Sequence, residues 1–392
     1  MTTVSEPRAA ATVFDFKRHI DRSGGDSLKW NRYAGRDIVP LWVADMDFSA
    51  PPAVLDALRQ RIGHGVLGYA KPWPSLIEAT LAHLNRQYGW SVDPDWLVWL
   101  PGVVPGLSLA CRAIAGDVVT ATPIYPPFLA VPESAGRVLT TAALHLDDEA
   151  GHRQWRWDWA ALEAAVTPTT RLLLLCHPHN PVGRAWRADE LAKLADFCQR
   201  HDLYVCSDEI HCDLILDADK RHTPLALAHP ELASRCITLM APSKTYNIPG
   251  LGCSFAIIQD PVLRARFAEA MCGIVPDVNV LGLVAAEAAY REGEPWRQAA
   301  LDVLRARRDR VEQAIADMPG LSTTHVEATY LAWIDARGLK VTDPAEFFEQ
   351  AGVGLSNGVD FGAPGWVRLN FACTAETLET ALARIRRACE RR

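Results

Sequence analysis

The feature that most constrains the fold is an alternation of strand-like and helix-like segments over residues 50–260. Three short segments in this region, 170–176, 203–207 and 235–240, are almost continuously apolar, as strands buried on both faces of a parallel sheet are. Between the first two, residues 189–201 have the apolar spacing of an amphipathic helix. This alternation predicts an α/β fold with a mostly parallel sheet sandwiched by helices.

The length and composition allow a second, smaller domain, because the chain has 392 residues of which 49% are hydrophobic. Residues 287–318 are predicted to form one long charged helix that bridges to this domain. Beyond it, predicted strands at 329–334 and 366–371 and a helix from Ala375 indicate an α+β layer. We therefore predict three regions: an N-terminal arm with part of the small domain in 1–50, a large cofactor-binding domain in 51–290, and a small C-terminal domain in 291–392.

The first half of the predicted large domain contributes two loops of interest, after a predicted strand at Leu41–Phe48 that ends in acids. The glycine turn at 101–106 leads into a predicted helix at 107–115. Free N–H groups and the positive end of the helix dipole make such a turn suitable for a phosphate. The predicted strand 118–122 ends in a rigid proline loop that contains Tyr125.

Three polar residues follow the buried strands one after another. Asn180, Asp208 and Lys244 each come directly after or at the end of such a strand, about one strand–helix unit apart. The carboxyl ends of the strands in an open α/β sheet are where ligands bind, so we expect the three side chains to share one rim. A partly desolvated lysine there has a lowered pKa and can form a Schiff base with a carbonyl.

The motifs around these residues resemble those of a known superfamily. His179-Asn-Pro-Val-Gly183, Ser207-Asp-Glu-Ile-His211 and Ser243–Leu251 are similar to the signatures of fold-type I pyridoxal 5′-phosphate (PLP) enzymes of the aminotransferase class I/II superfamily. The resemblance covers nearly the whole chain. A narrower resemblance, to the MalY/PatB branch of cystathionine β-lyases and related cysteine-conjugate C–S lyases, lies in four segments: Lys29-Trp30, Trp42–Phe48, His64–Tyr69 and Val367–Ala372.

The resemblance implies a role for each residue at the centre of the site. Lys244 would hold PLP covalently and move the Cα proton of the substrate as general base. Asp208 would keep the pyridine nitrogen protonated, and Asn180 would donate a hydrogen bond to the phenolic oxygen of the ring. Tyr125 would stack on the ring, and Arg368 would bind the α-carboxylate of the substrate through two parallel hydrogen bonds.

The same resemblance implies a phosphate site and a dimer. Gly102, Val103 and Val104 would offer backbone N–H groups to the phosphate, and Ser243 would add its hydroxyl. Tyr69 would reach the phosphate region of the neighbouring subunit. The expected assembly is thus a homodimer with shared active sites.

Three positions depart from the pattern of many aminotransferases. Gly252 stands where an arginine often grips the phosphate, and nothing in the sequence indicates what replaces that charge. His211 stands in the place of a common tyrosine and is expected beside the cofactor, and Ala241 stands in the place of a serine. We interpret these departures as features of the lyase branch.

The sequence thus predicts a PLP-dependent C–S β-lyase that converts L-cystathionine or a similar cysteine S-conjugate to a thiol, pyruvate and ammonia. An aminotransferase acting on an L-amino acid is the alternative, because it shares nearly every motif. A regulatory protein that keeps the fold and mainly binds a partner is a third hypothesis, against which Lys244, Asp208 and Arg368 argue. The identity of the cysteine conjugate stays open.

Several other classes of protein find no support. The net charge of −7 gives no electrostatic attraction to a nucleic acid, and no segment has the apolar length of a membrane span. The N-terminus lacks the basic-then-apolar order of a secretory signal, so a cytoplasmic protein is expected. The ten cysteines include no CxxC pair and match no standard zinc spacing, so we predict reduced thiols and no metal.

Overall fold

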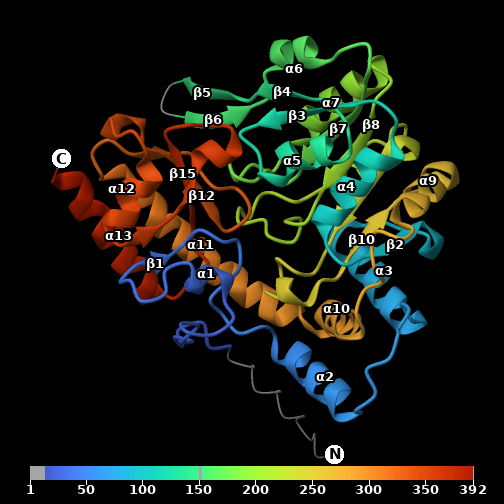
Figure 1. The fold of residues 1–392 in the computed structure, drawn as a ribbon, viewed down its shortest axis with the longest axis horizontal. Coiled ribbons are helices and arrows are strands. Elements are labelled where there is room, and N and C mark those ends of the chain that lie inside the picture. Colours follow the sequence, from blue (N-terminus) through green and yellow to red (C-terminus); the bar gives the residue numbers. More distant parts are fainter. Residues whose placement is uncertain (1–13, 150–151, 392) are drawn as a thin grey trace, which may run out of the picture.

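The computed structural model describes residues 14–149 and 152–391. A large sheet with helices on both faces occupies one side of the molecule, and the C-terminal elements, orange to red in Figure 1, gather beside it. Part of the N-terminal segment, blue in the same view, lies against these C-terminal elements. None of the helices in the described ranges is long and apolar enough to cross a membrane.

The large sheet has seven strands in an order that confirms the predicted α/β architecture. Strand β10 is antiparallel to both of its neighbours, and every other pairing in the sheet is parallel. From one edge to the other the strands are β2 (Leu97–Leu100), β10 (Ser254–Ile257), β9 (Cys236–Met240), β8 (Tyr204–Asp208), β7 (Thr170–Cys176), β3 (Asp117–Thr122) and β4 (Leu139–Ala143).

The central strands are apolar on both faces because helices cover both. In β7, Leu172 and Leu174 pack in one hydrophobic cluster, while Leu173 and Leu175 belong to the other. This is the alternation that a pleated strand imposes on successive side chains. The first cluster includes side chains of α4 (Val103–Ala113), α5 (Pro127–Ser134) and α9 (Pro261–Met271); the second includes those of α6 (Trp159–Ala165), α7 (Ala188–Arg200) and α8 (Leu225–Ala228).

A smaller antiparallel sheet forms the centre of the C-terminal part. Its strands, in spatial order, are β11 (Ser322–Thr323), β12 (Leu331–Asp335), β15 (Trp366–Asn370) and β14 (Ser356–Asn357). The helices of this part are α11 (Glu294–Ala316), α12 (Pro344–Gln350) and α13 (Ala375–Glu390). Strand β1 (Val39–Pro40) pairs in parallel with β13 (Val353–Gly354), so the N-terminal segment is attached here. The domain limits at residues 50 and 290 stay a prediction.

The remaining α-helices and strands belong to neither of these two sheets. The helices are α1 (Leu28–Asn31), α2 (Pro52–Gly63), α3 (Pro74–Tyr88) and α10 (Val280–Glu292), and the hairpin strands are β5 (His145–Glu149) and β6 (His152–Arg156). Helix α3 buries Leu76, Ala79, Thr80, His83 and Leu84 and ends at Tyr88, where Gly89 caps it in the left-handed conformation.

The predicted strand at Leu41–Phe48 is wrong. Only β1, just before it, pairs as a strand, and residues 41–48 are irregular. The backbone of this segment is hydrogen-bonded by side chains from distant parts of the chain. The Nδ2 of Asn370 donates to the carbonyl oxygens of Val43 and Asp45, each at 2.6 Å, and the Nδ2 of Asn247 donates to that of Met46 at 3.0 Å. These tertiary hydrogen bonds therefore take the place of the strand-to-strand hydrogen bonds that the local apolar pattern predicted.

Two helix predictions also need correction. Residues 287–318 do not form one helix, because α10 ends at Glu292 and α11 begins at Glu294. Pro295 lies in the first turn of α11, where its missing N–H has no cost, whereas inside a continuous helix it would break the hydrogen-bond ladder. The helix predicted from residue 107 begins earlier, at Val103, directly after Gly102.

Candidate active site

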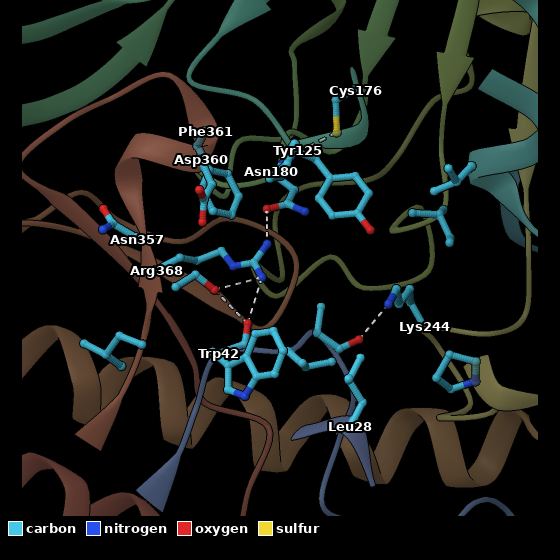
Figure 2. A pocket seen from close by; sticks show the side chains of 18 of the residues that line it. Leu28, Trp42, Tyr125, Cys176, Asn180, Lys244, Asn357, Asp360, Phe361 and Arg368 are labelled. Atoms are coloured by element: carbon cyan, nitrogen blue, oxygen red, sulfur yellow. Dashed lines mark hydrogen bonds between the residues drawn. The ribbon is translucent and has the colours of Figure 1, made fainter. Parts of the chain in front are cut away.

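One cavity of about 810 Å³ lies where the carboxyl ends of the large sheet face the small sheet and the N-terminal segment. Ten of the eleven predicted site residues line it: Gly102, Val103, Val104, Tyr125, Asn180, Asp208, His211, Ser243, Lys244 and Arg368. Figure 2 shows the cavity with Lys244 on one side and Arg368 on the other. The eleventh residue, Tyr69, does not reach it.

Lys244 extends from the loop that follows β9. Its Nζ donates a hydrogen bond of 2.6 Å to the carbonyl oxygen of Ala44, in the irregular N-terminal segment. Burial, with a smaller contribution from the Arg368 cation, lowers the pKa of Lys244 to about 8, although Asp45 and Asp208 act in the opposite direction. A larger share of the amine is therefore neutral, and nucleophilic, near neutral pH than for an exposed lysine.

Asp208 is the last residue of β8 and is 4% exposed. Its Oδ1 accepts a hydrogen bond of 3.1 Å from the backbone N–H of Ile210. Burial raises the pKa of Asp208 to about 7, because a carboxylate loses hydration there and no cation pairs with it among the described residues. A cationic group placed against this carboxyl would stabilise its ionised form and lower the pKa, so the site fits a protonated ring nitrogen.

Glu209, the residue after Asp208, is fully buried and holds the turn that follows β8. The Oε1 of Glu209 accepts from Ser207 Oγ at 2.8 Å and from the backbone N–H of Leu225 at 3.1 Å. Its Oε2 lies 2.6 Å from Nε2 of His222. These bonds fix the backbone on both sides of Asp208 and thus the direction of its carboxyl group.

Arg368, on β15, joins three parts of the chain at the far side of the cavity. Its Nη1 donates to Asn180 Oδ1 at 3.0 Å, and its Nη2 donates to the carbonyl oxygen of Trp42 at 2.9 Å. Its Cζ lies 4.8 Å from the ring centroid of Phe361. Burial lowers the pKa of Arg368 to about 10, and within the described residues its Nε has no hydrogen-bond partner and no carboxylate pairs with the guanidinium. A buried cation in this condition fits the carboxylate of a ligand.

The glycine turn forms the wall near Lys244. Helix α4 begins at Val103 with Gly102 as its N-cap, and no side chain caps its first N–H groups. These groups and the Ser243 side chain face one cavity, as a bound phosphate would require. Gly252 lies against this turn and has a left-handed φ of +55°. A Cβ on it would lie 2.9 Å from the carbonyl oxygen of Pro101. An arginine cannot occupy this position without moving the turn.

Two ring side chains complete the wall around Asp208. Tyr125 lies on the proline loop after β3, where burial raises the pKa of its hydroxyl. His211 is 3% exposed, and burial lowers the pKa of its imidazole to about 3, so the ring is neutral at physiological pH. Its Nδ1 has no partner among the described residues.

Tyr69 lies outside this cavity, on the loop between α2 and α3. Its side chain is fully exposed, and it lines a separate depression with Leu67 and Val280. A single subunit thus does not bring Tyr69 together with the other ten residues.

The sequence reasoning missed several groups that line the cavity. The carbonyl of Ala44 binds Lys244, and a backbone acceptor gives no signal in the residue type. Trp42 belongs to a motif of the branch, but it was not predicted as a site residue. Arg32 and Asp360 also line the cavity; Arg32 lies two residues after the Lys29-Trp30 motif but was not predicted, and Asp360 lies in a segment for which no motif was given.

Comparison with known proteins decides the family. The family Aminotransferase class I and II matches residues 36–385. The chain belongs to this family. Cystathionine beta-lyase PatB of Bacillus subtilis is 35% identical over 95% of the chain and 99% of that protein. Among solved structures, OvoB is 50% identical with a TM-score of 0.93, covering 96% of this chain and 99% of that one. The PLP-bound C-S lyase of Staphylococcus hominis is 30% identical with a TM-score of 0.89, covering 97% and 99%.

These similarities confirm the fold-type I architecture and the lyase branch predicted from the motifs. They extend over nearly the full length of the chain and of each relative, so the small C-terminal part and the irregular N-terminal segment are included. The aminotransferase class I and II family therefore accounts for both sheets and for the segments that meet between them.

Proposed function

We propose that this protein is a PLP-dependent C–S β-lyase that cleaves L-cystathionine or a related cysteine S-conjugate to a thiol, pyruvate and ammonia. The observation that carries the proposal is the position of the segment Trp42–Phe48, whose sequence resembles the lyase branch. Its carbonyl groups bind both ends of the site, Ala44 to Lys244 and Trp42 to Arg368. The part of the chain that distinguishes the branch is thus a wall of the cavity.

PLP fits the residues present. When bound, PLP supplies an electron sink for the electron pair left at Cα after a proton is removed. We assign its aldehyde carbon to Lys244, its ring nitrogen to Asp208, and its phenolic oxygen to Asn180. The first N–H groups of α4 with Ser243 would hold the phosphate, Tyr125 would stack on the ring, and His211 would lie beside the cofactor.

The roles of the protein groups follow from their positions. Arg368 holds the α-carboxylate of the substrate, and its bonds to Asn180 and Trp42 fix the plane of the guanidinium. Lys244 faces the same cavity and, once the substrate amine has displaced it, is a neutral amine that would take the proton from Cα. The thiolate then leaves from Cβ, and the remaining three-carbon fragment hydrolyses to pyruvate and ammonia. Because no group stays behind on the enzyme, each turnover is complete without a second substrate.

We also propose a cytoplasmic homodimer in which Tyr69 serves the cofactor of the neighbouring subunit. Supporting this, Val66, Leu67 and Tyr69 are large side chains that are 63%, 58% and 109% exposed on one loop. Apolar groups exposed together in this way mark interaction surfaces. Mixing Tyr69→Phe chains with Lys244→Ala chains tests it: activity should recover in hybrid dimers, and a fully active monomer would contradict the assignment.

A lyase and an aminotransferase differ in whether continued turnover requires a second substrate. We expect continuous turnover of L-cystathionine with no keto acid added, with one pyruvate released per thiol. An aminotransferase would instead stop after one turnover and resume when a keto acid is supplied. Lys244→Ala is the matched control, because it should release no pyruvate under either condition.

A further inference from the structure

The motif Lys29-Trp30 has no part in the chemistry assigned to the cavity, because neither side chain lines it. Lys29 is nevertheless a fully buried cation, with an exposed fraction of 0%. Burial of a charge destabilises a protein unless the charge is paired and hydrogen-bonded. The partners of Lys29 therefore show what the motif holds in place.

Lys29 belongs to a group of four side chains, Arg22, Lys29, Asp45 and Asp47, whose formal charges cancel; we call it the four-charge cluster. The Nζ of Lys29 lies 2.7 Å from Asp47 Oδ2 and 3.6 Å from Asp45 Oδ1. The guanidinium of Arg22 bridges the same two acids, at 2.6 Å from Asp45 and 2.7 Å from Asp47. Trp30 adds a hydrogen bond of 3.3 Å from its Nε1 to Asp47 Oδ1.

The residue before Asp45 is Ala44, whose carbonyl oxygen binds the reactive lysine. It accepts a hydrogen bond of 2.6 Å from Lys244 Nζ, which Figure 2 draws as a dashed line. It also accepts one of 3.0 Å from the hydroxyl of Tyr330, whose pKa is raised by burial. A carbonyl oxygen has two lone pairs, so each donor can use one of them. Tyr330 can therefore keep the carbonyl in place while Lys244 is bound elsewhere, and the second lone pair stays open to the amine.

Lys29 contacts the chain on both sides of Ala44. On one side, the Nε1 of Trp42 donates to the main-chain carbonyl oxygen of Lys29 at 3.0 Å. On the other side, the Lys29 ammonium pairs with Asp47 and faces Asp45. The backbone around Ala44 is irregular, so its position depends on contacts of this kind. Lys29 thus fixes the carbonyl from both directions along the chain.

The cluster also acts on Lys244 through its charges. Burial and the Arg368 cation lower the pKa of Lys244, whereas the Asp45 and Asp208 carboxylates raise it. The neighbouring His211 is neutral near pH 7, because burial lowers its pKa to about 3. The charge of Asp45 at Lys244 is therefore offset mainly by the cations that pair with Asp45 in the cluster.

We propose that Lys29 is a positioning residue for Lys244: through the four-charge cluster it holds the Ala44 carbonyl where this oxygen receives the amine whenever the amine is free of the cofactor. The amine would occupy this place before PLP arrives and again after the substrate amine has displaced it. The inference rests on the assignment of PLP to Lys244 in the proposed function. It adds a second, built position for the same amine.

Three variants that differ in the charge of the cluster test it. Lys29→Met leaves one negative charge in excess, Asp45→Asn leaves one positive charge in excess, and Lys29→Met/Asp47→Asn is balanced again. The full-length, cofactor-free protein of each variant is mixed with PLP over a series of pH values. Borohydride then fixes the attached cofactor, and peptide mapping gives the extent of attachment at Lys244 against pH.

The midpoint of attachment should follow the sign of the cluster charge. An excess carboxylate stabilises the ammonium form of Lys244, so the midpoint should rise from about 8 in Lys29→Met and fall in Asp45→Asn. We expect a shift of roughly one pH unit in each direction, the low end of what one close charge contributes. The double variant should return to about 8. Purely structural damage would not give shifts of opposite sign.

Lys220→Met is the matched control. Lys220 also bridges two carboxylates, Asp217 at 3.4 Å and Glu327 at 2.6 Å, but neither acid is among the groups that shift the pKa of Lys244. Its midpoint should stay at about 8.

Midpoints that move in the same direction in Lys29→Met and Asp45→Asn, or in neither, would overturn the inference and leave PLP attachment and the lyase intact. Asp45→Asn alone decides if Lys29→Met does not fold, because the amide keeps the shape of the carboxyl group: an unchanged or raised midpoint contradicts the inference. Absence of attachment at Lys244 in the unaltered protein would instead refute the cofactor assignment, and pyruvate release tests the lyase separately.

Discussion

The cavity has an inner wall, with the charged residues Asp208, Lys244 and Arg368, and a mouth, with Arg32 and Asp360. The two regions differ in how the protein holds these charges. Asp208 and Arg368 are each 4% exposed, Lys244 is partly buried, and all three bond to groups of the chain. Arg32 and Asp360 are exposed and have free charged groups among the described residues. Burial shifts the pKa values of the inner groups, so this wall is suited to moving protons. The charges at the mouth are open to solvent instead.

Asp208→Asn should give the largest effect that distinguishes the two regions. The amide keeps the shape of the carboxyl group but cannot stabilise a cation on the ring nitrogen. Removing one such preorganised electrostatic partner lowers kcat by roughly 10²–10³. Because the loss arises at the centre of the site, kcat for L-cystathionine should fall by this factor, whereas Arg32→Gln and Asp360→Asn at the mouth should change kcat far less.

The unfolding transition of the cofactor-free Asp208→Asn protein provides the control. Burial already favours the neutral form of this carboxyl group, so a neutral amide should not lower the stability. Near-normal kcat in Asp208→Asn, or an equally large loss in Arg32→Gln, would remove the distinction between inner wall and mouth.

The pH at which Lys244 becomes reactive should follow from its burial. Burial and the Arg368 cation lower its pKa to about 8, from 10.5 for an ordinary lysine. At pH 7 about a tenth of the amine is then neutral, against fewer than about one in a thousand for an exposed lysine, a difference of more than about 100-fold. The rate of covalent attachment of pyridoxal 5′-phosphate to the cofactor-free protein should therefore rise with pH through a midpoint of about 8.

Attachment is measured by borohydride reduction and peptide mapping, with Lys244→Ala as the control that should show no attachment at this loop. Peptide mapping also reports attachment at exposed lysines such as Lys71, on the loop before α3, so reaction at Lys244 is separated from reaction elsewhere in the chain. A midpoint near 10.5, the ordinary value for a lysine, would mean that the inner wall does not alter the chemistry of Lys244.

The sequence predicts the inner wall well because strand order determines it. Asn180, Asp208 and Lys244 lie at the ends of β7, β8 and β9, which are adjacent and parallel, so their positions follow from the buried apolar runs. Arg368 lies on the small sheet, far away in sequence. Only the resemblance to a family indicated it.

The mouth could not be predicted in this way. Arg32 follows the four-residue helix α1, and Asp360 lies in the short 3₁₀ helix Gly358–Phe361. Tertiary contacts, such as the stacking of Arg32 on Trp42, help to determine where such short segments lie. The same cause explains the wrong strand at Leu41–Phe48: that segment has an extended apolar pattern, but side chains of Asn247 and Asn370 bind its backbone. Local patterns do not report hydrogen bonds made by residues two hundred or more positions away.

The smallest expected effect concerns the backbone of the inner wall, at Gly252. Its left-handed φ of +55° costs an alanine roughly 1–2 kcal/mol, and the added Cβ would lie 2.9 Å from the carbonyl oxygen of Pro101. Pro101 directly precedes Gly102, so relief of this contact would move the first N–H groups of α4. We expect Gly252→Ala to raise the dissociation constant of PLP about tenfold, which corresponds to about 1.4 kcal/mol.

Gly250→Ala is the matched control two residues earlier, because a Cβ there meets no atom within 4 Å and its φ is not in the left-handed region. Its effect on PLP binding and on the free energy of unfolding should stay within about 0.5 kcal/mol. If both alanines weaken PLP binding equally, the loop as a whole, rather than the contact with Pro101, sets the phosphate site. If only Gly252→Ala does, the glycine found where many aminotransferases have an arginine is required by the turn itself, and the inner wall is constrained in its backbone as well as in its side chains.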